Sequence, residues 1–486
     1  MLREQEVIKG CPTELLIGGE WRAAEGGKTL GVEDPATGTT LCEVADGSPA
    51  DGMAALDAAV AAQAEWAATA PRERSGILRR TYELMTERAD ELALLMTLEM
   101  GKPIAESKGE VAYAAEFFRW FAEEAVRIEG GYQVAPTGKG RVLVMRQPVG
   151  PCLLITPWNF PAAMGARKIG PAVAAGCTMV MKPASQTPLS MLKQAELMAE
   201  AGLPPGVLNV ITTSDSGGVM EPLIKDGRAR KLSFTGSTEI GRRLIEQAAD
   251  KVLRTSMELG GNAPLIVFGD ADLDKAVDGA MLAKLRNGGE ACTAANRMYV
   301  HSSVMEAFAA KLTERMSTVK VGRGTEEGVD LGPLIDAKQR DKVKDLVEDA
   351  VAKGAKVLLG GKVADGKGYF YPPTVLADVP ATARVQKDEI FGPVAPLTSF
   401  ETEDEVVRMA NDTEFGLVSY LFTTDLNRAL RVSEKLETGM VGLNQGIVSN
   451  PAAPFGGVKQ SGLGREGGTV GIHEYLEVKY IAVALD

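Results

Sequence analysis

The sequence predicts an α/β fold with a doubly wound parallel sheet, and two observations support this. Between residues 150 and 259, short apolar stretches alternate with amphipathic stretches of helical period, which is typical of repeated strand–helix units. A second section of the same kind begins near residue 264. The length of 486 residues suits two or three domains. In such sheets ligands bind beyond the carboxyl ends of the strands, so a site is expected in the loops that follow them.

The N-terminal section is predicted to be helical. Residues 51–66 are rich in alanine, residues 71–101 repeat apolar side chains at intervals of three and four, and residues 105–127 are amphipathic. Residues 130–149 then alternate polar and apolar side chains around a Pro-Thr-Gly-Lys-Gly turn. This change of period predicts a β-hairpin that leaves the main body as an arm.

Turn residues divide the first strand–helix section into elements. Pro161 suits the first turn of a helix, and Gly176 and Gly202 suit helix C-termini. Strands are expected at 152–155, 178–181, 207–211, 231–234 and 253–257, and helices at 161–175, 189–201 and 238–249.

The second section is expected to begin with a buried strand at 264–268. Helices are expected at 276–287, 304–317, 336–353 and 403–411. The tail, residues 474–484, alternates and then becomes wholly apolar. Because an exposed apolar strand is prone to association, we expect it to pair with the hairpin arm or with another subunit. This predicts a homodimer or a homotetramer.

Composition argues against several classes of partner and site. The chain has 53 basic and 65 acidic residues, a net charge of −12, so a nucleic acid is not an expected partner. Its five cysteines include no Cys-x-x-Cys, and only two histidines are present, so no disulfide framework, metal site or Ser-His-Asp triad is predicted. No signal peptide and no spanning helix is evident, and the cytoplasm is the expected location with no membrane partner.

Cys292 is the candidate nucleophile. It lies in Leu285-Arg-Asn-Gly-Gly-Glu-Ala-Cys-Thr-Ala-Ala-Asn296, where two glycines precede a small and nearly uncharged patch. Such a setting leaves space for a substrate to approach the sulfur, and a thiolate is a strong nucleophile near neutral pH. The alternative is a buried cysteine that packs as a small apolar side chain.

Two loops after predicted strands carry candidate donors. Asn159 lies between two prolines in residues 156–161, which predicts a rigidly held amide that can stabilise an oxyanion. The alternative is an asparagine that makes a local turn. Lys182 ends a buried strand, where it needs an anion or a hydroxyl, such as a nucleotide phosphate or ribose. Otherwise its stem extends to solvent.

Two further loops and a later turn complete the set. Residues 234–241 form a Gly-rich strand-to-helix turn whose N–H groups suit a pyrophosphate, although the GxGxxG spacing is missing. Glu258 ends another buried strand before two glycines. Its carboxylate is either capped by backbone donors or kept partly protonated as a general base. The turn Glu389-Ile-Phe-Gly-Pro-Val394 likewise places a glutamate shortly before turn residues.

Together these loops resemble the aldehyde dehydrogenase superfamily, from about residue 30 to the C-terminus. The matching positions are Asn159, Lys182, 236–241, Glu258-Leu-Gly-Gly, Cys292 and Glu389-Ile-Phe-Gly-Pro. The resemblance implies three parts. These are a discontinuous NAD(P)-binding domain at 1–129 and 150–258, an α/β catalytic domain at 259–467, and a small β oligomerisation arm at 130–149 and 468–486.

The resemblance also implies roles. Cys292 would be the nucleophile, Asn159 with the Cys292 backbone N–H the oxyanion hole, and Glu258 the base that activates water. The implied reaction is thiolate attack on an aldehyde, hydride transfer to NADP or NAD, and hydrolysis of the thioester to a free acid. Lys182 and Glu389 would contact the riboses and Ser237 the pyrophosphate. The remaining cofactor-binding candidates are Thr156, Pro157, Trp158, Ser185, Gly236, Leu259 and Phe391.

Two arginines bear on the choice of aldehyde. Arg286 lies six residues before Cys292, and Arg167 lies on the helix after the Asn159 loop. Both could hold a carboxylate at the far end of a substrate, or each could form a structural ion pair. Segments 157–164, 166–168, 284–287 and 459–466 resemble the succinate-semialdehyde dehydrogenase subfamily, which implies Ser449 as a third carboxylate contact. Glutarate semialdehyde, which is longer by one methylene, is the alternative substrate, because one methylene changes the binding free energy by only about 1–3 kcal/mol.

Two positions depart from the pattern of many relatives. Ala294 stands where a second cysteine often follows the nucleophile, so no regulatory disulfide is expected there. Ser185 stands where NAD-specific relatives place a glutamate, and a serine would not repel a 2′-phosphate, which favours NADP. The rival hypotheses are a broad-specificity aldehyde dehydrogenase, a dinucleotide-binding structural protein without turnover, and a thiol esterase without redox chemistry.

Overall fold

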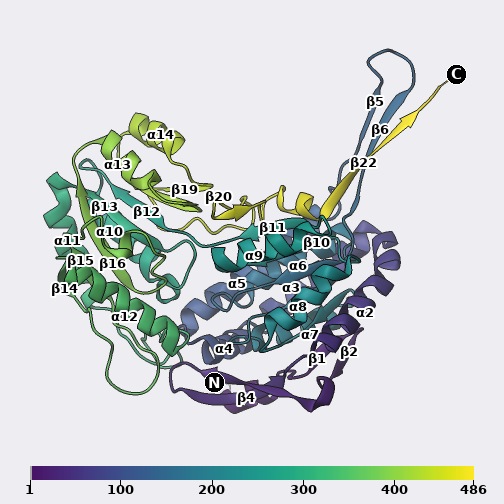
Figure 1. Cartoon of the computed structure of the whole chain (residues 1–486), viewed down its shortest axis with the longest axis horizontal. Coiled ribbons are helices and arrows are strands. Elements are labelled where there is room, and N and C mark those ends of the chain that lie inside the picture. The colour runs from purple at the N-terminus through teal and green to yellow at the C-terminus, as the bar shows by residue number, and fades with distance from the viewer. Residues whose placement is uncertain (1–2, 486) are drawn as a thin grey trace.

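The computed structural model describes residues 3–485, which form two α/β lobes and a projecting arm (Figure 1). The first lobe is built on an eight-stranded sheet whose five central strands are parallel. Its strand order is β2 (Glu20–Arg22), β1 (Leu15–Ile17), β9 (Leu208–Val210), β8 (Met179–Lys182), β7 (Cys152–Ile155), β10 (Lys231–Thr235), β11 (Arg254–Glu258) and β21 (Gly462–Leu463). The two edges, β1–β2 and β21, run antiparallel to their neighbours. The predicted doubly wound sheet is confirmed.

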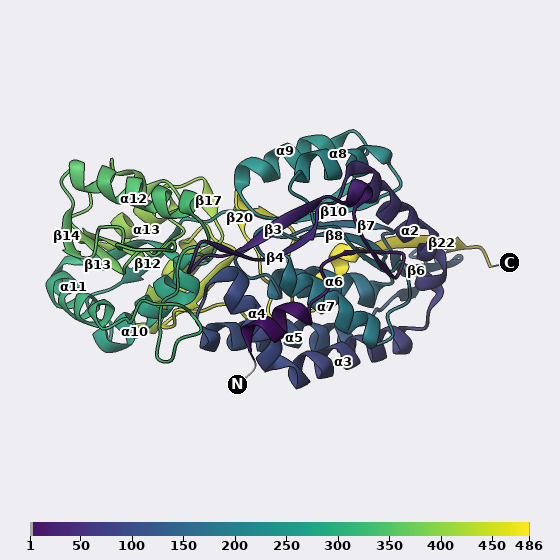
Figure 2. The ribbon, with the colours of Figure 1, turned by 90° about the horizontal axis from the view of Figure 1, so that it is seen from below.

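Helices cover both faces of this sheet, as Figure 2 shows edge-on. One layer holds α3 (Pro71–Glu87), α4 (Ala89–Met100), α5 (Ile104–Glu124), α6 (Ala163–Ala175) and α7 (Leu189–Glu200). The other holds α2 (Pro49–Ala68), α8 (Ser216–Asp226) and α9 (Thr238–Ala249). Leu154 of β7 packs with the first layer and Leu153 with the second. Because both faces are buried, the strands read as continuous apolar runs, and this is why they were predictable.

Three local predictions need correction. The single helix expected over 71–101 is two, because Arg88 leaves helical geometry between α3 and α4. The helix expected from Pro161 begins at Ala163, so Pro161 precedes it. The helix α8 was not predicted. The two glycine helix ends are confirmed, since Gly176 and Gly202 have φ of 90° and 95°, where glycine is favoured.

The second lobe contains a seven-stranded sheet that is parallel except for its edge strand β14. Its order is β14 (Lys356–Leu359), β15 (Thr374–Ala377), β16 (Val394–Phe400), β13 (Ala295–His301), β12 (Ala263–Val267), β18 (Val418–Phe422) and β19 (Met440–Leu443). The helices are α10 (Leu273–Leu285), α11 (Ser302–Ser317), α12 (Ala337–Ala352), α13 (Glu403–Asn411) and α14 (Leu426–Lys435). Each of the four helices predicted here is present, with ends shifted by a few residues or none.

The arm is a three-stranded antiparallel sheet that leaves the first lobe (Figure 1). It consists of β5 (Gly131–Val134), β6 (Arg141–Pro148) and the C-terminal β22 (Leu476–Val483), which pairs with β6 over its whole length. Of the two partners expected for the tail, the structure therefore shows the hairpin. The domain boundaries proposed from the sequence stay a prediction. Across residues 3–485, no helix is both long and apolar enough to span a membrane.

Candidate active site

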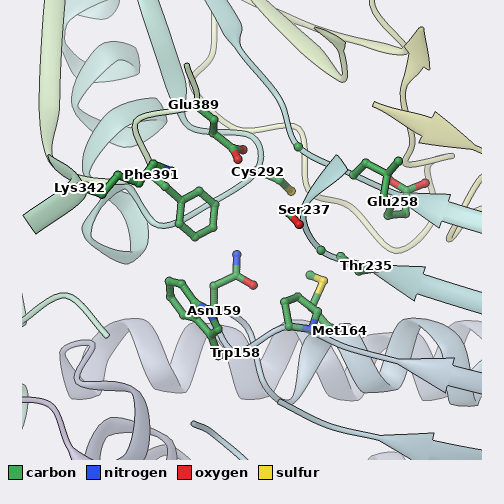
Figure 3. Close-up of a pocket in the computed structure, with 14 residues that line it drawn as sticks. Trp158, Asn159, Met164, Thr235, Ser237, Glu258, Cys292, Lys342, Glu389 and Phe391 are labelled. Atoms are coloured by element: carbon green, nitrogen blue, oxygen red, sulfur yellow. The ribbon is translucent and has the colours of Figure 1, made fainter. Parts of the chain in front are cut away.

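A cavity of about 210 Å³ lies where the two lobes meet, and the loops that follow β7, β10 and β11 form one wall (Figure 3). Asn159, Glu258 and Cys292 all line it, although they are far apart in the sequence. In Figure 3 the Cys292 sulfur and the Asn159 amide nitrogen both point into this space. The structure therefore brings together the three residues that the sequence suggested for catalysis.

The backbone before Cys292 explains the two glycines of its loop. Asn287, Gly288 and Gly289 have φ of 56°, 64° and 77°, three left-handed residues in succession. A Cβ at Gly289 would lie 2.3 Å from the carbonyl oxygen of Gly392, so only glycine fits there. This tight turn carries Cys292 from the end of α10 to the cavity wall. Cys292 thus lines a cavity, as a nucleophile must, and is not a cysteine that only packs as a small apolar side chain.

The charge state of Cys292 depends on opposing influences. The net effect raises the pKa of the thiol to about 12: burial, Glu389 and Glu258 raise it, and Arg167 and Arg286 lower it. Burial is the largest of these, because a thiolate loses more hydration than a thiol does. The resting group near neutral pH is therefore the thiol, and a nucleophilic role requires a base to remove its proton.

Asn159 is held from several sides, as its position between two prolines suggested. Its Nδ2 donates to the Glu290 carbonyl oxygen at 2.9 Å. Its backbone carbonyl oxygen accepts hydrogen bonds from Lys102 Nζ and from Asn287 Nδ2, each at 2.9 Å. These partners come from the first lobe and from the Cys292 loop. The asparagine thus joins the two lobes and does not merely close a local turn.

Glu258 lies at the end of β11 with 4% of its surface exposed. Within the described chain, its Oε2 has no hydrogen-bond partner. Burial, and then the charge of Glu466, raise the pKa of this carboxyl well above its ordinary value, while Arg167 and Lys168 lower it. Backbone capping would have lowered the pKa instead. The structure therefore favours the alternative in which this carboxyl is kept partly protonated.

Seven of the ten cofactor candidates line the same cavity. They are Pro157, Trp158, Gly236, Ser237, Leu259, Glu389 and Phe391. Ser237 is the N-cap of α9, so the N-terminus of this twelve-residue helix opens at the cavity. The rings of Trp158 and Phe391 meet edge to face with centroids 5.4 Å apart. Glu389 accepts a hydrogen bond from the Gly261 N–H at 3.0 Å, while burial raises its pKa.

The other three candidates lie away from the cavity. Lys182 is buried and donates to Ser216 Oγ at 2.7 Å, so it meets a hydroxyl as expected, and burial lowers its pKa to about 8. Ser185 lines a separate cavity of about 280 Å³. Thr156 is buried, with its Oγ1 4.0 Å from Met181 Sδ.

These positions fit an elongated ligand. The strands β8, β7 and β10 are neighbours in the sheet, and their carboxyl ends carry Lys182, the 156–161 loop and Ser237 in that order. Lys182 is a buried ammonium whose hydrogen bond is to a neutral hydroxyl, and Thr235 Oγ1 is a buried hydroxyl with no partner in the described residues. A row of donors along one sheet edge, ending at a helix N-terminus, suits a dinucleotide.

A second cavity, of about 370 Å³, contains the substrate candidates Arg286 and Ser449. Arg286 Nη1 donates to Ser449 Oγ at 3.1 Å, and its guanidinium lies over the Phe160 ring at 4.9 Å. Phe160 follows Asn159 directly in the chain, so the two cavities lie on either side of the same loop. The structure thus places Arg286 and Ser449, two of the three predicted carboxylate contacts, at one cavity.

Arg167 occupies a different environment from Arg286. It is 2% exposed, its Nε lies 2.9 Å from Glu466 Oε2, and its guanidinium stacks 3.8 Å from the Phe455 ring centroid. Lys168 approaches the other oxygen of Glu466 at 2.6 Å. The ion-pair alternative therefore describes Arg167, although its Nη2 has no hydrogen-bond partner among residues 3–485. The residues that line the two cavities do not include Arg167.

Several residues of these cavities carry no recognisable signal in the sequence. Lys342 lines the first cavity from α12, and Tyr113 lines the second from α5. Both lie within amphipathic helices, where one more polar side chain on a face is indistinguishable from a solvent-exposed one. Lys102 lies beside a predicted helix stop and was read only as part of that stop.

Known proteins match the chain over almost its whole length. The model of the "Aldehyde dehydrogenase family" matches residues 21–481. A succinate-semialdehyde dehydrogenase of Paenarthrobacter nicotinovorans is 59% identical over 444 residues, which cover 91% of this chain and 99% of that protein. A glutarate-semialdehyde dehydrogenase of Pseudomonas putida is 55% identical over 469 residues, covering 96% and 97%. The crystal structure of an NADP-dependent enzyme of Escherichia coli has a TM-score of 0.97 and 52% identity, with 100% of both chains covered.

The family model and these relatives extend across both lobes and the cavity between them. The chain therefore belongs to the aldehyde dehydrogenase family.

Proposed function

We propose that this protein oxidises an aldehyde that carries a terminal carboxylate, with succinate semialdehyde as the first choice, to the free acid. The observation that carries the proposal is the Arg286–Ser449 pair on a cavity separated from Cys292 only by the Asn159–Phe160 loop. A guanidinium and a hydroxyl at the wall of a half-open cavity suit a carboxylate, because charge-assisted hydrogen bonds are stronger than neutral ones. The named succinate- and glutarate-semialdehyde dehydrogenases among the relatives support the same class.

In this proposal Cys292 forms a covalent bond with the substrate. The thiol first gives its proton to solvent water, and Sγ then attacks the aldehyde carbon as the carbonyl electrons move to oxygen. The Asn159 side chain and the Cys292 backbone N–H donate to that oxyanion. Only one of the two Asn159 amide hydrogens is needed for the bond to Glu290, so the other is free for this purpose.

Oxidation and hydrolysis complete the reaction. The residues that would hold NADP or NAD are Lys182, Ser185, Ser237, Glu389 and the 156–158 segment, and the bound nicotinamide supplies the acceptor for the hydride that leaves the substrate carbon. The resulting thioester is attacked by water, and Glu258 takes the proton of that water. A carboxyl with a raised pKa is a stronger base than an ordinary one, which suits this task.

The two cofactors are favoured by different features. Ser185 carries no charge that would repel a 2′-phosphate, which supports NADP. The same cavity also has Glu33, Glu99 and Asp336 on its wall, and these carboxyl groups favour NAD. We propose NADP as the preferred cofactor and NAD as the alternative.

Steady-state rates test the proposal directly. We expect kcat/KM for succinate semialdehyde to exceed that for butanal by at least about tenfold, since a charged carboxylate contact contributes about 1.5–3 kcal/mol. Glutarate semialdehyde should lie between the two or near succinate semialdehyde. Each aldehyde is measured with NADP and with NAD. Equal efficiency on succinate semialdehyde and butanal would show a broad-specificity enzyme instead, and cofactor-independent turnover alone would indicate an esterase.

A further inference from the structure

A buried ion pair contacts the Asn159 loop, and its two residues, Lys102 and Glu110, line the second cavity and not the first. Lys102 follows Gly101 in the connection between α4 and α5, and Glu110 lies on α5. Their side chains are 2% and 1% exposed and form a salt bridge. Lys102 Nζ also donates to the Asn159 carbonyl oxygen at 2.9 Å and lies 4.3 Å from the Phe160 ring centroid. One ammonium therefore contacts two consecutive residues of this loop.

Glu110 holds the other end of the same loop. Its Oε1 accepts hydrogen bonds from the backbone N–H groups of Ala162 and Ala163, at 3.0 Å and 3.1 Å. These residues begin α6, so the carboxylate caps the N-terminus of that helix from a neighbouring element. The ion pair thus binds the backbone on both sides of Phe160, and one unit positions the whole stretch from Asn159 to Ala163.

Asn287 completes the support from the second lobe. Its Nδ2 donates to the backbone carbonyl oxygens of Asn159 and Glu290, at 2.9 Å and 3.0 Å. The Asn159 side chain donates to the same Glu290 oxygen. The backbone carbonyl oxygen of Asn159 is held by two donors, and one hydrogen of its side-chain amide is bonded to Glu290, so the residue is fixed through both its backbone and its side chain. Its remaining amide hydrogen is directed by these contacts.

A buried ion pair is weak evidence for stability, because desolvation of both charges offsets their attraction. Its value here is geometric, since a displacement of about 1 Å in a catalytic group can cost about 10²-fold in rate. We propose that Lys102 and Glu110 are positioning residues that hold the Asn159 amide in place for the developing oxyanion. This inference rests on the proposed role of Asn159.

A double-mutant cycle tests it. Lys102→Met removes the ammonium but keeps much of the side-chain volume, and Asn159→Ala removes the amide. With butanal, which has no carboxylate to meet the second cavity that Lys102 also lines, we expect each single variant to lower kcat by about 10- to 10³-fold with little change in KM. The double variant should be no slower than Asn159→Ala by more than about threefold, because a clamp has no effect once its target is gone. Glu110→Gln, which keeps an acceptor for the Ala162 and Ala163 N–H groups, should be less impaired than Lys102→Met.

Lys193 provides a matched control. It is a buried lysine that pairs with Glu91 at 2.8 Å and with Glu196 at 2.9 Å and donates to the Gly10 carbonyl oxygen at 2.9 Å. Like Lys102 it combines ion pairing with a bond to a backbone carbonyl, but it lines neither cavity. Lys193→Met should lower the thermal midpoint as Lys102→Met does but leave kcat unchanged. If Lys102→Met yields no folded protein, Glu110→Gln takes its place in the cycle.

Two outcomes would overturn the inference. One is a wild-type kcat in folded Lys102→Met, and the other is a double variant in which the two losses multiply. Failure of the underlying function would look different, because Asn159→Ala alone would then keep the full rate.

Discussion

Among single residues, Cys292 allows the most direct prediction, which concerns the pH dependence of its reactivity. Its pKa of about 12 means that the thiolate fraction is small at neutral pH and rises tenfold with each unit of pH below that value. In the protein without added cofactor, we expect the rate of Cys292 alkylation by iodoacetamide to rise about tenfold per pH unit between pH 7 and 9. Mass spectrometry of the peptide that contains residue 292 gives the rate, and Cys292→Ala identifies it. A plateau below pH 8.5 would mean that the thiolate is already formed at rest.

Glu258 makes a prediction about the order of steps. Glu258→Gln removes the base but keeps the shape of the side chain, so acylation should proceed while hydrolysis slows by about 10²- to 10⁴-fold. Rapid-mixing absorbance should show a burst of NADPH or NADH of about one equivalent per active site, followed by a slow phase. In the wild type, hydrolysis should speed up as pH rises through the raised pKa of Glu258, since the carboxylate is the active form. A full steady-state rate in the variant would exclude this role.

Arg286 and Ser449 make a prediction about substrate choice. Arg286→Ala removes a donor that faces the second cavity, so KM for succinate semialdehyde should rise about 10- to 100-fold. Butanal has no carboxylate and serves as the internal control, with its KM expected to change by less than about threefold. Ser449→Ala should also raise KM for succinate semialdehyde, but by less, because a neutral hydrogen bond contributes about 1 kcal/mol. Parallel changes for both aldehydes would point to a structural role for Arg286.

At the scale of elements, the Glu99 carboxyl of α4 caps the N-terminus of α7. Its two oxygens accept from the Leu189 and Ser190 N–H groups at 2.7 Å and 2.8 Å, yet burial raises its pKa to about 7. A carboxyl whose pKa is raised by folding stabilises the fold fully below its unfolded pKa, and this stabilisation is lost as pH rises through the folded value. The loss between about pH 4.5 and pH 7 amounts to about 3 kcal/mol.

Urea unfolding of the wild type and of Glu99→Gln at pH 5 and pH 7.5 measures this effect. The midpoint of the wild type, relative to that of the variant, should fall as pH rises, because an amide does not ionise. The same pH dependence in both proteins would show that Glu99 does not titrate in this range.

At the scale of the molecule, the arm predicts association. Its sheet leaves large side chains in solvent, with Tyr132, Val478 and Tyr480 exposed by 69%, 61% and 60%. Such a sheet, projecting from the body in Figure 1, is an expected interface between copies of this chain. Light scattering at micromolar concentration should give the mass of a dimer or a tetramer, and Val478→Asp with Tyr480→Asp should lower it to that of the monomer. Leu430→Asp, at an exposed position on α14, is the control that should leave the mass unchanged. A monomeric wild type would refute the prediction.

The sequence by itself determined the parts of the fold whose signals are local. The five parallel strands of the first sheet were predictable because burial on both faces makes them short apolar runs between turn residues, and Cys152–Ile155 was predicted to the residue. The loops after those strands were predictable as a site because parallel strands present their carboxyl ends at one edge. The first four strands were missed, and so was α8, whose two glycines and internal Pro222 lower its helix propensity.

Only the tertiary structure decided which distant residues meet. Arg286 and Ser449 are 163 residues apart, and Lys102 and Asn159 are 57 apart. It also decided that Arg167 pairs with Glu466, and that the C-terminal strand adds to the hairpin of its own chain. A local pattern reports on a residue's own helix or strand, whereas contacts of this kind depend on the path of the whole chain. The family of this protein could therefore be predicted from its loops, but the support of Asn159 and the meeting of Arg286 with Ser449 at one cavity could not.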